Sequence, residues 1–328
     1  MPPKVLITGA TGFIGSHLVE ELLSLNWDVV CLVRKKSRTS YLERFPVTLK
    51  QIDVNDVSAL ERAVYDREYI FHSAARIRSA PKEVYDRANV QFTRNLCRAC
   101  LYAKPPIKHL VYVSSIAAAG PSPKGKILDE SNPPEPSSEY GRSKLRGEDA
   151  VREIWNQIPC TIIRPPNVYG PRQQETEMLI KLLQKRILPV LKSYAKNTTL
   201  IYVRDLVNGM IQAALSDAAA HNIYYLTDQN VYSWREILIQ MKEQVLGKKI
   251  YFPLHENLIY SAAFVTDMLK KTKLLNVYFG RKIWNAMVNT KWLFSSKKAS
   301  QDFGFNPSYS LDKGLKETYA YYRQQNSC

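Results

Sequence analysis

The sequence predicts an α/β protein in which a doubly wound parallel sheet is covered by helices on both faces and followed by a smaller, mostly helical C-terminal lobe. Short apolar runs alternate with stretches of helical periodicity. A glycine-rich turn separates the first apolar run from the first helical stretch. Beyond Gly170 the alternation loosens into helices with short extended pieces. We therefore assign residues 1–170 to the sheet domain, with segments around 200–227 returning to it, and residues 171–328 mainly to the second lobe.

Six runs have the length and composition of buried strands. They are Val5 to Thr8, Val29 to Val33, Thr48 to Ile52, Tyr69 to Phe71, His109 to Ser114 and Cys160 to Arg164. Strands that are buried on both faces read as continuous apolar runs, and parallel neighbours need helical crossovers between them. Sheets of this kind collect ligands at the carboxyl ends of their strands. We therefore looked for candidate site residues directly after each run.

The first strand end carries the segment TGATGFIGSHL, residues 8–18. Gly9 suits the tight turn, Gly12 lets the backbone approach a diphosphate, and Gly15 lets the helix pack closely on the strand. The helix start supplies unpaired N–H groups and partial positive charge. A lone glycine triplet is more often a plain turn, but this strand-turn-helix context predicts a Rossmann dinucleotide site. Its candidate cofactor contacts are Gly9, Thr11, Gly12, Phe13, Ile14 and Gly15.

The end of the second predicted strand bears on the choice of cofactor. An acidic residue usually holds the ribose hydroxyl there, whereas arginine accommodates a 2′-phosphate. Here the strand ends in Arg34, followed by two lysines, with no carboxylate. This favours NADP(H) over NAD(H), which remains the alternative, as does a plain solvated basic turn. Asp53, with its neighbour Val54, is placed to meet the adenine, although a capping or turn role for Asp53 stays open.

A second group of residues carries chemistry. Ser114 and Ser115 end the fifth strand, and Tyr140 and Lys144 stand four apart at a helix start, so the last two share one helical face. A phenol of pKa ~10 is a poor base at pH 7, by roughly 4 kcal/mol, and an ammonium about 4 Å away offers an attraction of similar size. Ser115 would donate a hydrogen bond to the reacting oxygen. The spacing alone is common on surface helices; the glycine motif makes the catalytic interpretation stronger.

At this point the chain resembles the extended short-chain dehydrogenase/reductase family over nearly its full length. The matching pieces are TGATGFIG, His72 to Ala75, Asn89 with Val90 and Thr93, Val113 to Ser115, Tyr140 with Lys144, and Arg164 to Pro171. The resemblance implies that Ser115, Tyr140 and Lys144 are catalytic and that Asn89 helps hold a proton-relay water. Ser115 precedes Tyr140 by 25 positions, as the family's pattern suggests, and Ser114 stays a possible substitute.

The same resemblance implies the cofactor contacts. Lys144 would bind the nicotinamide ribose, and His72 would be a loop residue beside the cofactor. The remaining implied contacts are Ser73, Ala74, Ala75, Pro165, Asn167 and Val168. With no cluster of histidines, we expect no metal site.

Within the family, the tail around Phe303 to Pro307 resembles dihydroflavonol-reductase-like and 3β-hydroxysteroid-dehydrogenase-like members. Dehydratases carry an acidic pair after the catalytic hydroxyl, where this chain has Ile116 to Ala119. Sugar-nucleotide epimerases usually show a Gly-Asp-Gly turn, where this chain has Tyr194 to Thr199. These departures favour hydride transfer to or from a carbonyl or secondary alcohol over chemistry on a nucleotide sugar.

We therefore expect an NADP(H)-dependent oxidoreductase acting on a bulky, apolar small molecule that is sterol-, isoprenoid- or flavonoid-like. The rich apolar and aromatic content of residues 255–294 suggests such a substrate, although it equally suits the core of the second lobe. A sugar-nucleotide epimerase is the alternative in chemistry. A non-catalytic dinucleotide sensor or scaffold is the alternative of another class, because fold alone does not establish activity.

The net charge and the cysteine content indicate which partners and which compartment suit the protein. A formal charge of +16 attracts anions: a phosphorylated cofactor, an anionic membrane or nucleic acid, unless it is simply a basic surface. No nucleic-acid-binding motif is visible. Peripheral membrane contact is compatible with Lys270, Lys271, Lys273 and Arg281 to Trp284. Five scattered cysteines and no secretory signal suggest a cytoplasmic protein, with Cys97 and Cys100 as ordinary helix packing. The resemblance also suggests a homodimer through helices around Asn89 to Ala103 and Tyr140 to Trp155.

Overall fold

The computed structural model describes residues 1–190, 197–247, 252–255, 261 and 290–325. Its main feature is a parallel sheet of seven strands in the order β10-β6-β5-β4-β1-β2-β3. The strands are β1 (Lys4–Thr8), β2 (Asp28–Val33), β3 (Thr48–Gln51), β4 (Tyr69–His72), β5 (His109–Val113), β6 (Cys160–Arg164) and β10 (Asn222–Tyr225). The order reverses between β1 and β4, and such a switch point opens a ligand crevice at the carboxyl ends of both strands. The predicted fold class is confirmed.

Each of the six predicted runs forms a strand, with ends within one residue of the expected positions. The alternation of side chains explains why these runs are apolar throughout. Val5 and Ile7 face one buried cluster and Leu6 faces another, so both faces of β1 are covered. The seventh strand, β10, comes from the segment that was expected to return to the sheet.

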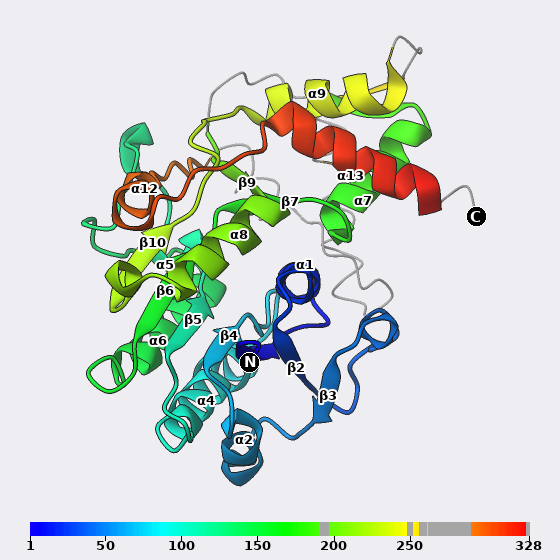
Figure 1. Ribbon diagram of the computed structural model, residues 1–328. Coiled ribbons are helices and arrows are strands. Elements are labelled where there is room, and N and C mark those ends of the chain that lie inside the picture. Colours follow the sequence, from blue (N-terminus) through cyan, green and yellow to red (C-terminus); the bar gives the residue numbers. More distant parts are fainter. Residues whose placement is uncertain (191–196, 248–251, 256–260, 262–289, 326–328) are drawn as a thin grey trace.

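Helices cover both faces, with α2, α4 and α6 on one and α1 and α8 on the other (Figure 1). Their bounds are α1 (Phe13–Ser24), α2 (Val57–Val64), α3 (Lys82–Tyr85), α4 (Phe92–Cys100), α5 (Ile116–Ala119), α6 (Glu139–Arg152) and α8 (Val203–Ala214). Single 3₁₀ turns cover Leu42–Arg44, Pro123–Gly125 and Asp217–Ala219. The chain passes from α3 into α4 through a π-helical segment, Asp86–Gln91. Cys97 and Cys100 are buried on α4 without a disulfide, as ordinary helix packing requires.

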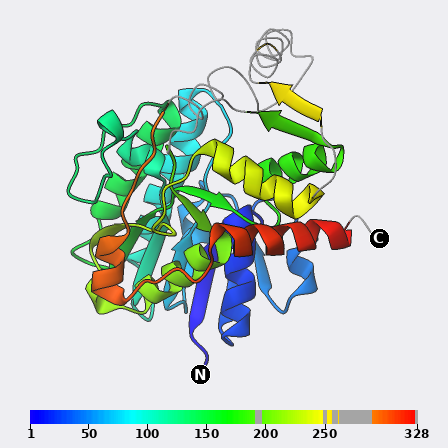
Figure 2. The same ribbon diagram turned by 90° about the horizontal axis from the view of Figure 1, so that it is seen from above.

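The second lobe lies beyond the sheet, on the side of α1 and α8. Among the residues that the structure describes, it contains two small parallel sheets and three helices. The sheets pair β7 (Asn167–Tyr169) with β9 (Leu200–Tyr202) and β8 (Ile187–Val190) with β11 (Phe252–His255), and the helices are α7 (Gln174–Gln184), α9 (Trp234–Leu246) and α13 (Leu311–Gln325). Helices α9 and α13 lie side by side, as Figure 2 shows from above. A third apolar cluster joins these helices to β7 and β9.

Part of the second lobe returns to the main sheet. Helix α12 (Lys297–Phe303) packs against β10, and Ala299 and Phe305 belong to the same core as β1. The segment around residues 297–305 therefore extends the sheet domain, which sequence periodicity did not indicate. Most of the apolar stretch 255–294, including the basic and aromatic residues proposed to contact a membrane, lies outside the described residues. Within the described part of the chain, none of the helices is both long and apolar enough to cross a membrane.

Candidate active site

The glycine turn after β1 has the geometry that its sequence predicts. Gly9 has a φ of +75°, and the Gly12 N–H donates to its carbonyl oxygen at 2.9 Å. A Cβ on Gly15 would come within 2.2 Å of that same oxygen, so only glycine allows helix α1 to start this close to the turn. Helix α1 has no side-chain cap and no acidic residue in its first turn. Its first N–H groups are therefore available to an anion, and a diphosphate fits this helix start.

The loop after β4 lies against the glycine turn. The Ser73 hydroxyl donates to the Thr8 carbonyl at 2.8 Å, and the Ala74 N–H donates to Thr8 Oγ1 at 3.3 Å. A Cβ on Gly9 would come within 2.6 Å of the Ala74 nitrogen. The predicted contacts Ser73, Ala74 and Ala75, all half-buried, thus line the switch point together with the glycine turn. Thr11 and Gly12 are exposed there, and Phe13 and Ile14 are half-buried in the first turn of α1.

Arg34 follows β2 directly and is exposed. Its backbone N–H donates to Ser37 Oγ at 3.0 Å and its carbonyl accepts from the Ser37 N–H at 2.8 Å, which closes a tight turn. The guanidinium forms no ion pair with any of the described residues. The turn therefore presents a cation directly after the carboxyl end of β2.

Asp53 is exposed in the turn after β3, and its Oδ1 accepts hydrogen bonds from the backbone and side-chain nitrogens of Asn55, each at 3.0 Å. This is the turn role that the sequence left open beside the adenine contact. Helix α2 is capped by Asp56 instead, through a bond from the Ala59 N–H. Val54 is half-buried and packs against the core under α2 and α4.

Lys144 is almost fully buried, with 1% of its surface exposed. Its Nζ donates to the Val113 carbonyl at 2.8 Å, at the very end of β5, and lies 4.1 Å from the centre of the Tyr112 ring. Burial lowers the pKa of Lys144 to about 7, while the nearby carboxylate of Glu148 raises it. The ammonium is therefore charged only near and below neutral pH.

The two candidate serines are distinguished by their surroundings. Ser114 is buried and its hydroxyl donates to Glu148 Oε1 at 2.6 Å. Ser115 is half-exposed and caps α5 by accepting a bond from the Ala117 N–H at 3.1 Å, which uses a lone pair of the hydroxyl and not its proton. Ser115 is therefore the serine whose proton can reach a ligand.

Tyr140 lies in the first turn of α6 because Ser138 caps that helix, accepting from the Gly141 N–H at 3.0 Å. The turn packs closely on α5: a Cβ on Gly141 would come within 2.1 Å of the Ala117 carbonyl oxygen. Since α5 follows Ser115 directly and Lys144 Nζ contacts the end of β5, the segments that carry the three predicted catalytic residues meet at the carboxyl end of β5. Tyr140 is half-buried and its ring lies 6.1 Å from that of Tyr85.

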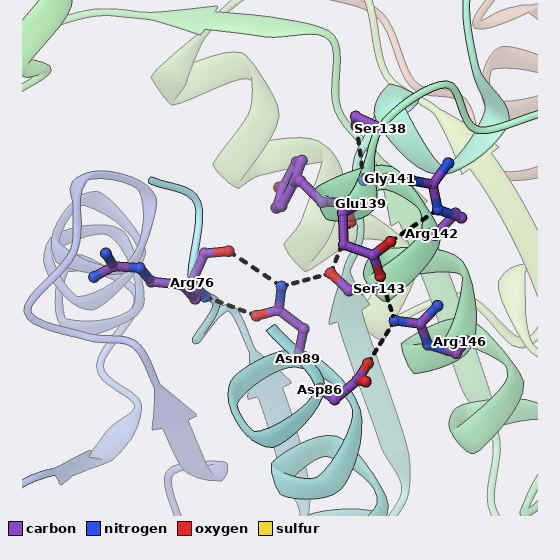
Figure 3. A network of polar contacts seen from close by, with 10 residues as sticks. Arg76, Asp86, Asn89, Ser138, Glu139, Gly141, Arg142, Ser143 and Arg146 are labelled. Atoms are coloured by element: carbon purple, nitrogen blue, oxygen red, sulfur yellow. Dashed lines mark hydrogen bonds and ion pairs between the residues drawn. The ribbon is translucent and has the colours of Figure 1, made fainter. Parts of the chain in front are cut away.

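Asn89 is completely buried within the π-helical segment. Its Nδ2 donates to the Arg76 carbonyl at 3.1 Å and to Ser143 Oγ at 2.9 Å, and its Oδ1 accepts from the Arg76 N–H at 2.7 Å (Figure 3). Both amide protons are used in these bonds. The side chain thus joins the loop after β4 to the turn that carries Tyr140.

Two features of the site were not anticipated from the sequence. His72 is the last residue of β4 and fully buried, not a loop residue beside the cofactor. Glu148 and Arg164 form a buried ion pair through two hydrogen bonds of 2.8 and 2.6 Å, which also holds Ser114. The spacing of Glu148, four residues after Lys144 on one helical face, is a signal that could have found it.

The residues expected at the nicotinamide end follow β6. Pro165 is buried and its carbonyl accepts from the Ile116 N–H at 3.1 Å. Asn167 is exposed, and its Nδ2 donates to Thr198 Oγ1 at 2.8 Å; Val168 is half-buried in β7. This segment therefore lies next to the start of α5, on the catalytic side of the sheet.

The chain is similar to known proteins over most of its length. The family model described as "NAD dependent epimerase/dehydratase family" matches residues 5–226. The chain is 27% identical to the N-acetyl-alpha-D-glucosaminyl-diphospho-ditrans,octacis-undecaprenol 4-epimerase of Escherichia coli O157:H7, covering 98% of this chain and 96% of that protein. It is 29% identical to a ceramide reductase of Caulobacter vibrioides, covering 97% and 94%.

A solved structure with the same fold is the UDP-glucose 4-epimerase of Thermotoga maritima with UDP-glucose, with a TM-score of 0.80, 22% identity, and coverage of 98% of this chain and 99% of that one. The glycine turn, the end of β5 and the first turn of α6 all lie within the residues that the family model matches. The chain thus belongs to the NAD dependent epimerase/dehydratase family and is an NAD(P)-dependent oxidoreductase of the extended short-chain dehydrogenase/reductase type.

Proposed function

We propose that the protein is an NADP(H)-dependent oxidoreductase that transfers a hydride between the nicotinamide and a carbonyl or secondary alcohol of a bulky, largely apolar substrate. The observation that carries the proposal is the arrangement at the carboxyl end of β5. Ser115 follows that strand, the Lys144 Nζ contacts its last carbonyl, and the first turn of α6, which carries Tyr140, packs on the helix that follows Ser115. The bound nicotinamide supplies or accepts the hydride.

Each protein group has a separate task in this proposal. Ser115 donates a hydrogen bond to the substrate oxygen and orients it. In the direction of reduction, Tyr140 gives its phenolic proton to that oxygen, and in oxidation it takes the proton back. Lys144 stabilises the phenolate left on Tyr140, because an ammonium in a dry site attracts an anion more strongly than it would in water.

The substrate class is supported by two relatives that align over nearly their full length. Their names specify an undecaprenol-linked sugar and a ceramide, both of which carry long apolar chains. The residues after Ser115 form the short apolar helix α5 with no carboxylate, so they provide no extra acid or base for dehydration. We therefore propose a lipid, sterol-like, isoprenoid or flavonoid ketone or alcohol.

Peripheral membrane contact belongs to the same proposal, because a lipid substrate has to be reached in or near a membrane. It rests on the sequence around Lys270 to Trp284, outside the described residues. The full-length protein should sediment with vesicles containing anionic lipid and remain in the supernatant with neutral ones. Equal recovery in both supernatants would contradict this part of the proposal.

An epimerase is the second candidate, favoured by the similarity to the undecaprenol-linked epimerase. An epimerase oxidises and then reduces the same carbon, so its cofactor ends in the redox state in which it began. A reductase consumes one nicotinamide cofactor for each carbonyl reduced. Net cofactor oxidation during turnover therefore separates the two.

The deciding experiment is a substrate screen with purified protein, followed through nicotinamide absorbance. It samples long-chain ketones, steroids, flavonoid ketones, aldehydes and sugar nucleotides. We expect NADPH oxidation with an apolar ketone and a loss of at least about 100-fold in Tyr140→Phe, whose NADPH affinity should remain within about twofold. The matched control is Tyr224→Phe, which removes the hydroxyl group that donates to Asp302 beside the edge strand β10. This variant should keep its turnover. Full turnover by Tyr140→Phe would refute the proposed role.

A further inference from the structure

His72 lies between two threonines that come from different elements. Its Nδ1 is 2.6 Å from Thr8 Oγ1 at the end of β1, and its Nε2 is 2.9 Å from Thr93 Oγ1 on α4. The ring is completely buried, and it contacts Phe92 edge-on. Burial lowers the pKa of His72 to about 3, assisted by the charge of Lys144, so the ring is neutral at physiological pH. A neutral ring has one donor nitrogen and one acceptor nitrogen.

The neighbouring bonds decide which nitrogen carries the proton. The Thr93 hydroxyl has a single proton, and it donates to the Asn89 carbonyl oxygen at 2.8 Å. Thr93 Oγ1 can then only accept from His72, so Nε2 carries the proton and Nδ1 accepts from Thr8 Oγ1. Thr8 Oγ1 in turn accepts from the Ala74 N–H. All the donors in this series of hydrogen bonds point the same way, from the loop after β4 to the backbone carbonyl of Asn89.

The series of hydrogen bonds continues beyond Asn89 to helix α6, which carries Tyr140. The Asn89 side chain donates to Ser143 Oγ, and the Ser143 hydroxyl donates to the Tyr140 carbonyl at 2.7 Å. Figure 3 shows Asn89 between Arg76 on one side and Ser143 on the other. The connection therefore runs from the cofactor-side loop to the turn that carries Tyr140, through five buried residues: Thr8, His72, Thr93, Asn89 and Ser143.

We propose that His72 is a positioning residue that fixes the turn carrying Tyr140 relative to the cofactor-side loop. Its Nε2–H tautomer holds the Asn89 turn from one side and the end of β1 from the other. The proposal rests on the proposed function only for its kinetic consequence. The tautomer and the mechanical link are properties of the protein without substrate.

A second histidine–threonine pair in the same sheet provides a matched control. His109 Nε2 is 2.8 Å from Thr161 Oγ1, and the Thr161 hydroxyl donates to the Ala219 carbonyl at 2.6 Å. Burial lowers the pKa of His109 to about 4. The chemistry is the same, but His109 starts β5 and therefore lies at the opposite end of the strands from the site.

The first test is the tautomer itself, read by NMR on protein carrying ¹⁵N-labelled histidine, with His72→Phe assigning the signal among five histidines. We expect His72 as the neutral Nε2–H form from pH 5 to pH 8. A signal showing the Nδ1–H form, or a cation at pH 6, would overturn the proposal whether or not a substrate has been found.

The second test is the mechanical link. Thr93→Val removes the hydroxyl without changing the shape of the side chain, and Thr161→Val does the same in the control pair. In protein with ¹³Cζ-labelled tyrosine, Thr93→Val should shift the Tyr140 signal, Thr93→Ser should restore it, and Thr161→Val should leave it unchanged. An unmoved Tyr140 signal in folded Thr93→Val would also overturn the proposal.

The third test uses turnover once a substrate is known. Thr93→Val should lower kcat roughly 10- to 100-fold, as a misplacement of the reacting groups would, with cofactor affinity within about twofold. Thr93→Ser should recover most of kcat, and Thr161→Val should lose similar stability while keeping kcat. If Thr93→Val and Thr161→Val lower kcat equally, the hydrogen bonds through His72 only stabilise the fold, and the proposed positioning role is wrong. If wild-type protein has no turnover on any substrate, the proposed function fails while the two NMR tests still stand.

Discussion

A lysine at the centre of the site combines a functional charge with a cost in stability. Lys144 is almost fully buried, and its Nζ contacts a carbonyl oxygen and the face of a ring, while no carboxylate of the described residues forms an ion pair with it. The native state therefore resists the protonated form, which lowers the pKa of Lys144 to about 7 from its usual value near 10.5. Below pH 7 the native state bears this cost in full, and the cost fades as the pH rises toward 10.5.

Lys144→Met should remove both the catalytic ammonium and the free-energy cost of burying its charge. We expect turnover to fall at least about 100-fold and the free energy of unfolding at pH 7 to rise by about 1–3 kcal/mol, since an apolar side chain of similar length replaces a buried charge. Urea unfolding at pH 7 and pH 9.5 should show the gain shrinking at the higher pH. Lys316→Met, an exposed lysine on α13, serves as the control and should change stability by less than about 0.5 kcal/mol. A loss of stability in Lys144→Met at pH 7 would contradict this account.

Arg34 is the residue on which the cofactor preference depends. Its exposed guanidinium follows β2, and the tight turn to Ser37 fixes its backbone. Arg34→Ala should weaken NADPH binding about 10-fold or more and leave NADH binding unchanged, because a charge-assisted bond to the 2′-phosphate is lost. Fluorescence titration of both cofactors measures this. Arg62→Ala, an exposed arginine on α2, controls for the change in net charge. Equal effects on both cofactors would remove Arg34 as the determinant.

At the scale of elements, the glycine turn and helix α1 act as one unit. The position of α1 against the turn depends on the absence of a single Cβ, since Gly15 lies directly over the Gly9 carbonyl. This close approach brings the helix N-terminus to the switch point between β1 and β4. The strand order creates the switch point, and the glycine turn brings the anion-binding N-terminus of α1 to it.

Gly15→Ala should displace this unit. We expect a loss of about 1–3 kcal/mol in the free energy of unfolding and at least about 10-fold weaker cofactor binding, because the new Cβ would overlap the Gly9 oxygen. Gly304→Ala is the control: its φ is +70° but the space around it is open, so it should cost about 1 kcal/mol without affecting the cofactor. Unchanged cofactor affinity in Gly15→Ala would show that the turn does not position the diphosphate.

At the scale of the whole molecule, one buried aspartate joins the sheet domain to the C-terminal segment. Asp205, in the first turn of α8, accepts hydrogen bonds from Ser308 N–H at 3.0 Å, Ser308 Oγ at 2.9 Å and Tyr309 N–H at 2.9 Å. Only 3% of its surface is exposed. Helix α13 begins two residues after Tyr309, so this contact sets where the last helix packs on the second lobe.

Asp205→Ala should loosen the C-terminal segment. We expect a loss of about 2–4 kcal/mol in the free energy of unfolding, because two backbone N–H groups lose their acceptor, and faster hydrogen exchange over residues 308–325. Ser308→Ala, which removes one of the three bonds, should lose about 1 kcal/mol. Equal losses in the two variants would mean that the backbone bonds contribute nothing.

The homodimer predicted through helices around Asn89 to Ala103 and Tyr140 to Trp155 stays a prediction. On the described faces of these helices, Arg98, Arg142 and Asp149 are exposed. Light scattering on the purified protein measures the mass directly. A dimer in which these charged residues form ion pairs would weaken with salt.

The candidate Asn89, and the choice of Ser115 over Ser114, came from the resemblance to a known family. Local pattern alone predicted the fold class, the six strands, the glycine turn and the pair of Tyr140 and Lys144 on one helical face. These follow from periodicity and spacing along the chain, which a sequence displays directly. Only the tertiary structure decided which serine is free to donate, and that His72 is a buried link. The register of the sheet sets Thr8 beside His72, and His72 beside Tyr112, across three strands that are far apart in sequence. Burial and hydrogen-bond direction depend on such neighbours, so no single segment of the chain contains them.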